Sequence, residues 1–557
     1  MVNLMKKKKS NLQKFHDEGV EYLTKYVSLM DIWKRQEFFL NCIKIIDKTF
    51  LDSMSTEDTT KGQFFAEILH FAYPVLIQYL YTDEFEELPA AVLAKLTEES
   101  LHECRTFLCS CQLVGWSAYL LELERLGIIQ IKNFLNRSKI VFRQKHHRIE
   151  FIESKFIQYY ERLISTRIEE DTRYKECCKN QERIKVRMRE LCFVWNEHFM
   201  GYDGDQEVED YFNNLSFLDS IHDTEWDMYP NDAAFNDVTY GSIVDSTVDL
   251  GGYAIKHIYF VGILKEKHPE LLTENLFYLI KMEEDLLKLI KENGELTDQQ
   301  AKKVLDILSL SSANKNLLFN TQAPCSPLIK ISKNQYIHSC AGSLYHPFSF
   351  MLDNLTMRHP DLCNSNRAKR ETVFRKQLYD MMSEFRCVDY PIIIAKNGQR
   401  VTDIDAAVID QKNGEIALFQ LKWQDHTSLS PKSLLSKAQN YTEEVTDWIE
   451  KVTKWIEDSS AVEIASLLGI KAKFVDKSKI YLFALGREHG NYSGEVPNTP
   501  NCARTQWYHF LNYILRNGRS DICISKMHRE LIEESPYKIS LDHKPKIYKY
   551  GKYRFIF

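Results

Sequence analysis

The spacing of apolar residues changes once along this chain of 557 residues, and the change divides it into two kinds of structure. From Leu12 to Leu191 apolar residues recur every three or four positions, and this spacing returns from Glu274 to Leu308. Such spacing predicts amphipathic helices. From Asn366 onward the order becomes helix, strand, strand, strand, helix, strand, helix. The sequence therefore predicts a multidomain protein with a mostly α-helical N-terminal region and a C-terminal α/β domain, in which helices flank a mixed central sheet.

Four segments are expected along the chain. They are a helical domain at 1–200, an acidic segment with further helices at 201–315, a short β-hairpin connector at 316–364 and the α/β domain at 365–557. The connector is predicted from two short extended runs that follow the turn-like stretch Pro324 to Pro327; the runs are Leu328 to Ser332 and Gln335 to Ser339.

The formal net charge of -6 is unevenly distributed along the chain. Residues 365–557 hold 30 Lys plus Arg against 24 Asp plus Glu, whereas the remainder holds 42 against 54. Only the C-terminal part has the sign expected of a surface that binds a polyanion. Between Tyr202 and Tyr240 there is no Lys or Arg. That acidic segment is interpreted either as a docking surface or nucleic-acid mimic for a basic partner, or as an acidic loop region between helical subdomains.

The cysteines and the N-terminal residues indicate a cytoplasmic protein. The thirteen Cys are scattered and form no C-x-x-C pairs, which favours reduced thiols. The basic start, Met5 to Lys9, is followed by the polar stretch Ser10 to Glu18 where a signal peptide would be apolar. The most apolar stretch, Phe64 to Tyr81, is interrupted by polar residues, so no membrane-spanning helix is expected.

Three polar side chains are expected to converge at one edge of the α/β domain. The strand predicted over Glu415 to Trp423 is apolar until Gln420 and Lys422, which share a face because strand side chains alternate. The hairpin turn at Lys412-Asn413-Gly414 can bring Asp405 beside them. A carboxylate, an amide oxygen and an ammonium group suit metal-assisted phosphodiester hydrolysis. The alternative is a hairpin whose polar ends are merely solvated.

These residues resemble the motif of a known superfamily. Asp405, fourteen intervening residues and then Gln420-Leu421-Lys422 on an apolar strand, after a helix bearing Glu371, resemble the PD-(D/E)xK or restriction-endonuclease-like nucleases. The Q-x-K pattern is similar to the Mrr-like variants of that superfamily. The resemblance covers about Ser365 to Leu515, which is the last third of the chain.

The resemblance implies a role for each of these residues. Asp405 would be the metal-binding aspartate, Gln420 would replace the usual glutamate, and Lys422 would be the catalytic lysine. Glu371 would complete the metal shell, and Asp403 is a nearby acid on the same strand face as Asp405. The implied cofactor is Mg²⁺, with Mn²⁺ as an alternative. No Pro precedes Asp405, and an amide in place of a carboxylate weakens metal binding unless Asp403 or Glu371 compensates.

Further candidates for nucleic-acid contacts lie on either side of this motif. In related nucleases the helix after the third motif brings a Gln or Lys to the phosphate, which points to Gln439 and Lys437; the alternative is that both are solvated helix positions. Arg487 and His489 follow the strand Lys479 to Leu485 and are in reach of a phosphate if that loop faces the substrate; otherwise they are simply exposed.

The C-terminal segment alternates basic and aromatic residues, among them Lys549, Lys552 and Arg554. This pattern is typical of a surface that neutralises phosphates and stacks on bases. It is equally typical of an edge strand whose aromatics pack inward while its lysines point outward.

The leading hypothesis is a Mg²⁺-dependent endonuclease that prefers DNA to RNA as its nucleic-acid partner. Its helical region would recognise a protein partner, a second copy of the chain or an activating signal, as in a bacterial defence or restriction effector; that role rests on family analogy. One alternative is a non-catalytic subunit that binds nucleic acid or protein through a degraded nuclease site. The other is a metal-independent ribonuclease, because Arg504 and His509 have the R-x-x-x-x-H spacing of a family of helical ribonucleases.

Overall fold

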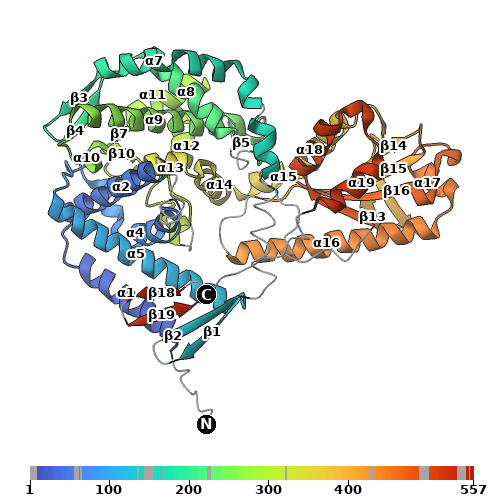
Figure 1. The fold of residues 1–557 in the computed structure, drawn as a ribbon, viewed down its shortest axis with the longest axis horizontal. Helices are drawn as coiled ribbons and strands as arrows, with labels where there is room; N and C mark the ends of the chain where they lie inside the picture. The colour runs from blue at the N-terminus through green and yellow to red at the C-terminus, as the bar shows by residue number, and fades with distance from the viewer. Residues whose placement is uncertain are drawn as a thin grey trace, which may run out of the picture.

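The computed structural model divides into two parts that α15 (Pro360–Met381) joins, a larger helical part and a smaller α/β domain (Figure 1). The residues that the structure describes are 9–54, 62, 65–134, 137–142, 156, 158–165, 167–222, 227–319, 323–425, 431–487, 501–535, 547–550 and 552–556.

The 28-residue helix α9 (Tyr240–Lys267) contributes to two of the apolar clusters around which the helical part packs. Its helices begin at well-defined caps: Thr97 and Thr297 each form a capping box with the third residue of the helix that follows. The other helices of this part are α1 (Asn11–Val27), α2 (Ile32–Met54), η1 (Ile68–Ala72), α4 (Tyr73–Leu80), η2 (Asp83–Glu87), α5 (Glu98–Arg125), α7 (Thr172–Leu191), α8 (Gln206–Ser220), α10 (Thr273–Leu276), α11 (Glu283–Gly294), α12 (Asp298–Leu308), η3 (Lys315–Phe319), α13 (Cys340–Leu344) and α14 (Pro347–Arg358).

Short strands interrupt the helical part at places where the sequence predicts helix or linker. The expected hairpin is present as β9 (Leu328–Lys330) and β10 (Gln335–His338), but it is not a connector. It forms the centre of a buried four-stranded sheet in the order β7-β10-β9-β8, completed by β7 (Ile280–Met282) and β8 (Ser309–Leu310). The helix expected from Glu274 to Leu308 is accordingly divided into α10, α11 and α12. Two further hairpins are β3 (Cys192–Trp195) with β4 (Phe199–Tyr202) and β5 (Ala234–Phe235) with β6 (Val238–Thr239).

The acidic segment is largely ordered structure rather than a loop. Asp205 caps α8 by accepting a hydrogen bond from the Val208 backbone N–H, and it pairs with Arg187 of α7. Lys256 of α9 pairs with Glu209. The basic partners of these acids therefore come from flanking helices of the same chain.

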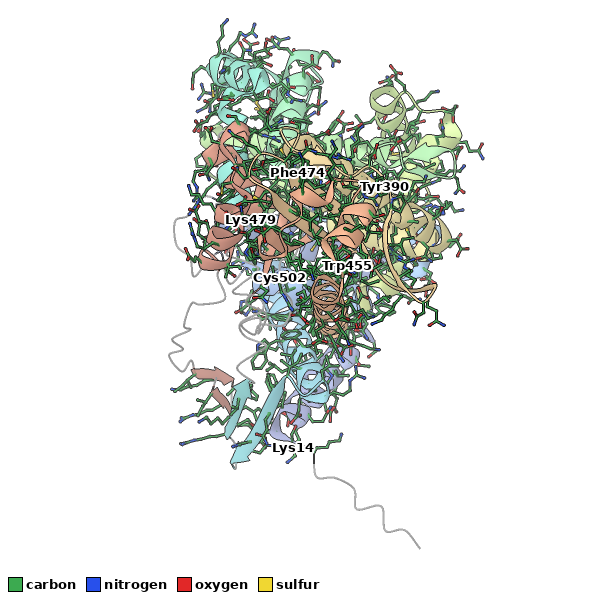
Figure 2. The ribbon with its side chains drawn as sticks, turned by 90° about the vertical axis from the view of Figure 1, so that its right-hand side faces the viewer. Lys14, Tyr390, Trp455, Phe474, Lys479 and Cys502 are labelled. Atoms are coloured by element: carbon green, nitrogen blue, oxygen red, sulfur yellow. The ribbon has the colours of Figure 1, made fainter. Side chains whose placement is uncertain are left out.

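A four-stranded sheet joins segments from opposite ends of the chain. Its order is β1 (Ile129–Phe134), β2 (Arg137–Phe142), β19 (Tyr553–Ile556) and β18 (Ile547–Tyr550), and β2 pairs with β19 in parallel. Figure 2 shows this sheet below the α/β domain, in which Trp455 and Cys502 are labelled. The α/β domain therefore does not extend to residue 557 as expected, because the last hairpin belongs to a sheet of the helical part.

The α/β domain is built on a five-stranded mixed sheet in the order β11-β14-β15-β16-β17. β14 runs antiparallel to both of its neighbours, whereas β15, β16 and β17 run parallel to one another. A separate hairpin of β12 and β13 turns at Asn397 and Gly398, which both have positive φ as such a two-residue turn requires. The strands are β11 (Arg386–Cys387), β12 (Ile392–Lys396), β13 (Gln399–Ile404), β14 (Ala406–Asp410), β15 (Glu415–Lys422), β16 (Ile480–Gly486) and β17 (Cys502–Gln506).

Helices cover both faces of this sheet, because the strands are apolar on both sides. α15, α18 (Trp507–Asn517) and α19 (Ile524–Glu533) pack on the face that carries Phe419 and Phe483. The opposite face, with Leu418 and Ala484, is covered by α16 (Pro431–Asp458), α17 (Ala461–Leu467) and the β12–β13 hairpin. Single turns at η4 (Ala472–Phe474), η5 (Lys477–Lys479) and η6 (Arg519–Asp521) complete the domain. The expected arrangement of a helical region and an α/β domain is therefore found.

Among the described helices, no segment combines the length and the apolar character that crossing a bilayer would require.

Candidate functional site

Asp405 and Gln420 lie directly opposite each other on neighbouring strands. The antiparallel register pairs Ala406 with Phe419, and the Asp405 backbone N–H donates to the Phe419 carbonyl at 3.0 Å. The Asp405 Oδ2 atom accepts hydrogen bonds from the Gln420 amide Nε2 and from the Leu421 backbone N–H, the latter at 2.7 Å. The Oδ1 atom receives no hydrogen bond from any described residue. One carboxylate oxygen is therefore fixed while the other is available to a ligand.

The environment of Asp405 disfavours its negative charge. The residue is only 6% exposed, and burial raises the pKa of its carboxyl to about 7. The Leu421 N–H and the Lys422 ammonium act in the opposite direction, whereas the nearby carboxylates of Glu371 and Asp403 raise the pKa further. Asp405 is thus a buried acid close to two other acids, an arrangement that a bound cation would relieve.

Lys422 shares the α16-facing side of the sheet with Gln420, two residues earlier on β15. Its Nζ donates to the Glu444 Oε2 atom on α16 at 2.8 Å, and its side chain is about one quarter exposed. Glu444 was not predicted from the sequence, because only the packing of α16 across the sheet places it there. Lys422 is therefore held at the edge of the site, in contact with solvent.

Glu371 and Asp403 affect Asp405 through their charge, and their ion pairs are with other residues. Glu371 pairs with Arg375 at 2.6 Å one turn along α15, and Asp403 pairs with Arg400 at 2.6 Å. Both carboxylates are 40% exposed or more. In the described part of the chain no three His, Cys, Asp or Glu side chains are close enough to hold a metal ion by themselves. The structure brings Asp405, Gln420 and Lys422 together, whereas Glu371 and Asp403 pair with arginines of their own elements.

The two α16 candidates differ in their position. Lys437 donates to the Asp425 backbone carbonyl at 3.0 Å, which ties the first turns of α16 to the segment that follows β15. Gln439 is exposed and donates to Glu443 at 2.8 Å along the same helix. Lys437 is thus positioned beside the end of β15, whereas Gln439 lies on the outer surface of the helix.

Arg487 is not the exposed loop residue that the sequence suggests. It is 5% exposed, and both its Nε and Nη2 atoms donate to the Oδ2 of Asp227 in the helical part, at 2.8 and 2.6 Å. A third donor, Nη1, bonds Gln377 of α15, and the guanidinium lies 4.5 Å from the centre of the Trp423 ring. Arg487 thus donates its hydrogen bonds to Asp227 and Gln377 and joins the two parts of the protein. His489 lies outside the described residues.

Arg504 and His509 lie on opposite faces of the sheet. Arg504 on β17 donates to the Thr446 hydroxyl of α16 at 3.1 Å. His509 is a buried residue of α18; its ring contacts the Thr505 hydroxyl at 2.6 Å and stacks on Tyr159. The pair therefore does not form one site, which removes the geometric basis for a metal-independent ribonuclease.

The C-terminal basic residues lie in or beside strands β18 and β19 of the sheet β1-β2-β19-β18, here called the terminal sheet, and not beside Asp405. The aromatic residues Tyr553 and Phe555 are buried there, whereas Lys549, Lys552 and Arg554 are exposed. Lys552 pairs with Glu18 of α1 at 2.8 Å. This inward and outward alternation is the one expected of a strand packed on a core.

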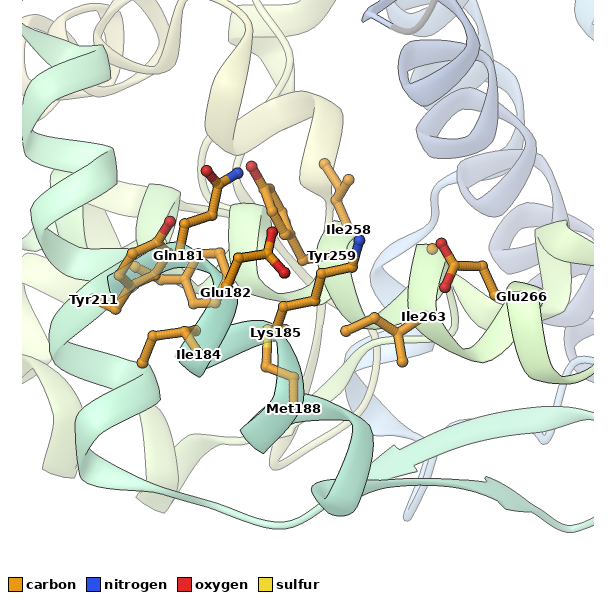
Figure 3. A pocket seen from close by; sticks show the side chains of 12 residues that line it. Gln181, Glu182, Ile184, Lys185, Met188, Tyr211, Ile258, Tyr259, Ile263 and Glu266 are labelled. Atoms are coloured by element: carbon orange, nitrogen blue, oxygen red, sulfur yellow. The ribbon is translucent and has the colours of Figure 1, made fainter. Parts of the chain in front are cut away.

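A cavity of about 250 Å³ lies between α7, α8 and α9 (Figure 3). Its walls combine apolar side chains, among them Ile184, Met188 and Ile263, with charged groups at the rim such as Lys185 and Glu266. No acid–base or nucleophile–base pair converges among the described residues that line it. The polar cluster around Asp405 therefore remains the candidate functional site.

Comparison of the chain with family models, with curated proteins and with solved structures gave no match.

Proposed function

We propose that the α/β domain is a metal-dependent nuclease of the PD-(D/E)xK class, which hydrolyses phosphodiester bonds and prefers DNA. The observation that carries this proposal is the direct opposition of Asp405 and Gln420, with Lys422 beside them, at the edge of a mixed sheet flanked by helices. Buried polar groups of this kind are costly in a core unless they serve a purpose.

The side chains around Asp405 fit a hard divalent cation such as Mg²⁺ or Mn²⁺. The free Oδ1 of Asp405 offers one oxygen ligand, and rotation of the Gln420 amide would offer its Oε1 as a second. Glu371 would supply a third ligand once it leaves its exposed pair with Arg375, and Asp403 is the alternative. When bound, such an ion would supply positive charge that polarises the phosphate and a bound water.

Lys422 is suited to act on the phosphate itself. Its ammonium group is held at the solvent edge of the site by an exposed carboxylate, Glu444, so a phosphate can replace that partner at little cost. In that position Lys422 would orient the attacking water or offset the negative charge that develops on the phosphate oxygens. Asp405 has to be ionised to serve, and a nearby cation favours its ionised form.

The test incubates the purified full chain with supercoiled plasmid, linear duplex, single-stranded DNA and RNA, each with Mg²⁺, Mn²⁺ or EDTA. We expect metal-dependent cleavage that Lys422→Ala abolishes while its unfolding midpoint stays close to that of the wild type. Lys451→Ala is the matched control, because Lys451 of α16 has a side chain that is 40% exposed and likewise pairs with a carboxylate, Asp447. Cleavage retained by Lys422→Ala, or cleavage that survives EDTA, would contradict the proposal.

A second candidate function is binding without cleavage. Gln420 donates its amide N–H to Asp405, whereas a glutamate at this position would place a further carboxylate oxygen beside the metal. A protein of this kind would retain oligonucleotide in a gel-shift assay, show no cleavage with any metal, and gain no thermal stability from Mg²⁺.

A further inference from the structure

A row of residues crosses the sheet from Asp405 to the last strand. The register places Gln420 opposite Asp405, pairs Gln420 with Ala484 of β16, and pairs Ala484 with Arg504 of β17. Residues paired across a sheet point to the same face, so Arg504 shares the α16-facing side with the candidate site. Its hydrogen bond to Thr446 of α16 agrees with this placement.

Arg504 is buried without a carboxylate partner. It is 6% exposed, and its single hydrogen bond in the described structure goes from Nη2 to the neutral Thr446 hydroxyl. The Nε atom is buried with no acceptor, and Arg504 forms no ion pair with any residue that the structure describes. A guanidinium stays charged at all physiological pH values, so burying it without a counter-charge is costly.

The other deeply buried arginines of the described chain each form an ion pair with an aspartate. Arg370 is 3% exposed and pairs with Asp425 at 2.7 Å, and Arg487 pairs with Asp227 at 2.6 Å. Arg504 departs from this pattern on the one face of the sheet that also carries Asp405, Gln420 and Lys422. Of these three arginines, only Arg504 lacks a carboxylate partner among the described residues.

Little separates Arg504 from the candidate site. On the intervening strand β16, the residues paired with Gln420 and Lys422 are Ala484 and Gly486, which carry a methyl group and a hydrogen. Two strand spacings separate Gln420 from Arg504, roughly 10 Å between backbones. An extended arginine side chain spans a large part of that distance.

We propose that Arg504 binds a backbone phosphate of the substrate, next to the phosphate that Lys422 contacts. This inference rests on the proposed nuclease function and adds a second phosphate subsite to it. The planar guanidinium can donate two parallel hydrogen bonds to phosphate oxygens, which fixes the strand in register with the Asp405 site.

The first test measures anion binding without cleavage, in EDTA. The probes are inorganic phosphate, followed by thermal unfolding, and a fluorescent single-stranded 12-mer oligonucleotide, followed by anisotropy. We expect Arg504→Met to weaken oligonucleotide binding about tenfold or more, as loss of a charged hydrogen bond does, and to remove the stabilisation by phosphate. Arg504→Lys should retain part of both effects. Arg125→Met, which changes an exposed arginine at the end of α5 in the helical part, is the control and should retain both.

A second readout separates phosphate binding from a merely structural role. Removal of an unpaired buried charge should leave the unfolding midpoint of Arg504→Met, measured without phosphate, equal to or above that of the wild type. A lower midpoint together with unchanged phosphate and oligonucleotide binding would overturn the inference. If Arg504→Met does not fold, Arg504→Lys provides the test. Unchanged phosphate and oligonucleotide binding by Arg504→Lys would also overturn the inference.

The two proposals fail in different ways. If the wild-type protein cleaves nucleic acid and Arg504→Met leaves KM and phosphate stabilisation unchanged, the subsite is wrong and the nuclease stands. If no cleavage occurs with any metal while Arg504→Met still loses oligonucleotide and phosphate binding, the anion subsite stands and the nuclease is wrong.

Discussion

Arg487, the first residue after strand β16, donates two hydrogen bonds to a single carboxylate oxygen of Asp227 in the helical part. The guanidinium also lies within 6 Å of the ring centres of Phe374, Trp423 and Trp507. Strand β16 lies between the strands that carry Lys422 and Arg504. This one ion pair therefore connects the helical part to the middle of the candidate site.

The Asp227–Arg487 pair is expected to be important for stability. Asp227→Asn would leave a buried guanidinium without its counter-charge, which typically costs about 3–5 kcal/mol. We expect a clear fall in the urea midpoint, followed by tryptophan fluorescence because Trp423 and Trp507 lie beside Arg487. Asp447→Asn, which breaks the exposed pair with Lys451, is the control and should cost less than about 1 kcal/mol. Equal shifts in the two variants would contradict this role.

The raised pKa of Asp405 predicts a specific dependence of stability on pH. Its pKa is about 7 in the folded protein and near 3.8 when unfolded, so between these values the folded state binds more protons. Stability contributed by this group therefore falls as pH rises from about 4 to about 7 and is constant above. We expect Asp405→Asn to gain stability relative to the wild type over this interval. The measurement is the difference between the two urea midpoints at pH 5 and pH 8.

Another buried acid titrates over the same range but does not disturb this comparison. The pKa of Asp47 is also raised to about 7 by burial, and Asp47 is present in both proteins. Its contribution cancels in the difference between wild type and variant. A difference that is the same at both pH values would show that Asp405 is not the buried, raised acid described here.

The aromatic side chains of β19 should matter more for stability than the basic ones. Phe555 is fully buried and packs edge-on against Phe15 and Trp116. We expect Phe555→Ala to cost about 3–5 kcal/mol, whereas the exposed Arg554→Ala should change stability by less than about 0.5 kcal/mol. Thermal unfolding of the two variants checks this. Lower oligonucleotide affinity in Arg554→Ala at unchanged stability would instead favour a nucleic-acid role for the segment.

Alanine substitutions at two glycines inside long helices are expected to change the free energy of unfolding in opposite directions. A Cβ at Gly115 of α5 would lie 2.1 Å from the Phe71 carbonyl oxygen, so the two helices would have to separate. A Cβ at Gly262 of α9 would meet nothing within 4 Å. We expect Gly115→Ala to destabilise by about 1–3 kcal/mol and Gly262→Ala to stabilise by about 0.5–1 kcal/mol. Unfolding midpoints that move in the same direction would contradict the close helix contact.

The local part of the candidate site could be predicted from the sequence. Asp405, Gln420 and Lys422 belong to one hairpin, so the turn at Gly414 and the alternation of side chains suffice to bring them together. The exact end of each strand could not be predicted in this way. The expected single strand from Asp403 to Ile409 is divided at Asp405, because β13 pairs with β12 while β14 pairs with β15.

The remote partners could not be predicted, because they depend on contacts between distant segments. Arg504 reaches the site only through the order of the parallel strands β15, β16 and β17, which no local pattern specifies. The sequence does not predict the burial of Arg487, because its carboxylate partner, Asp227, lies 260 residues earlier. For the same reason the hairpin of β1 and β2 could not be predicted within a region of helical spacing, because the strand that pairs with β2 is β19.

The terminal sheet has a consequence for the order in which the protein can complete its fold. β2 pairs in parallel with β19, more than 400 residues later, and the cluster beneath this sheet also receives Leu435 from the first turns of α16. During synthesis, the apolar side of β1 and β2 lacks Tyr553 and Phe555 until the more than 400 residues that separate β2 from β19 have been made. Helix α16 covers Lys422 and Arg504. The packing of its first turns is complete only once these two aromatic residues are in place. Packing at the start of α16 is thereby coupled to the synthesis of β19.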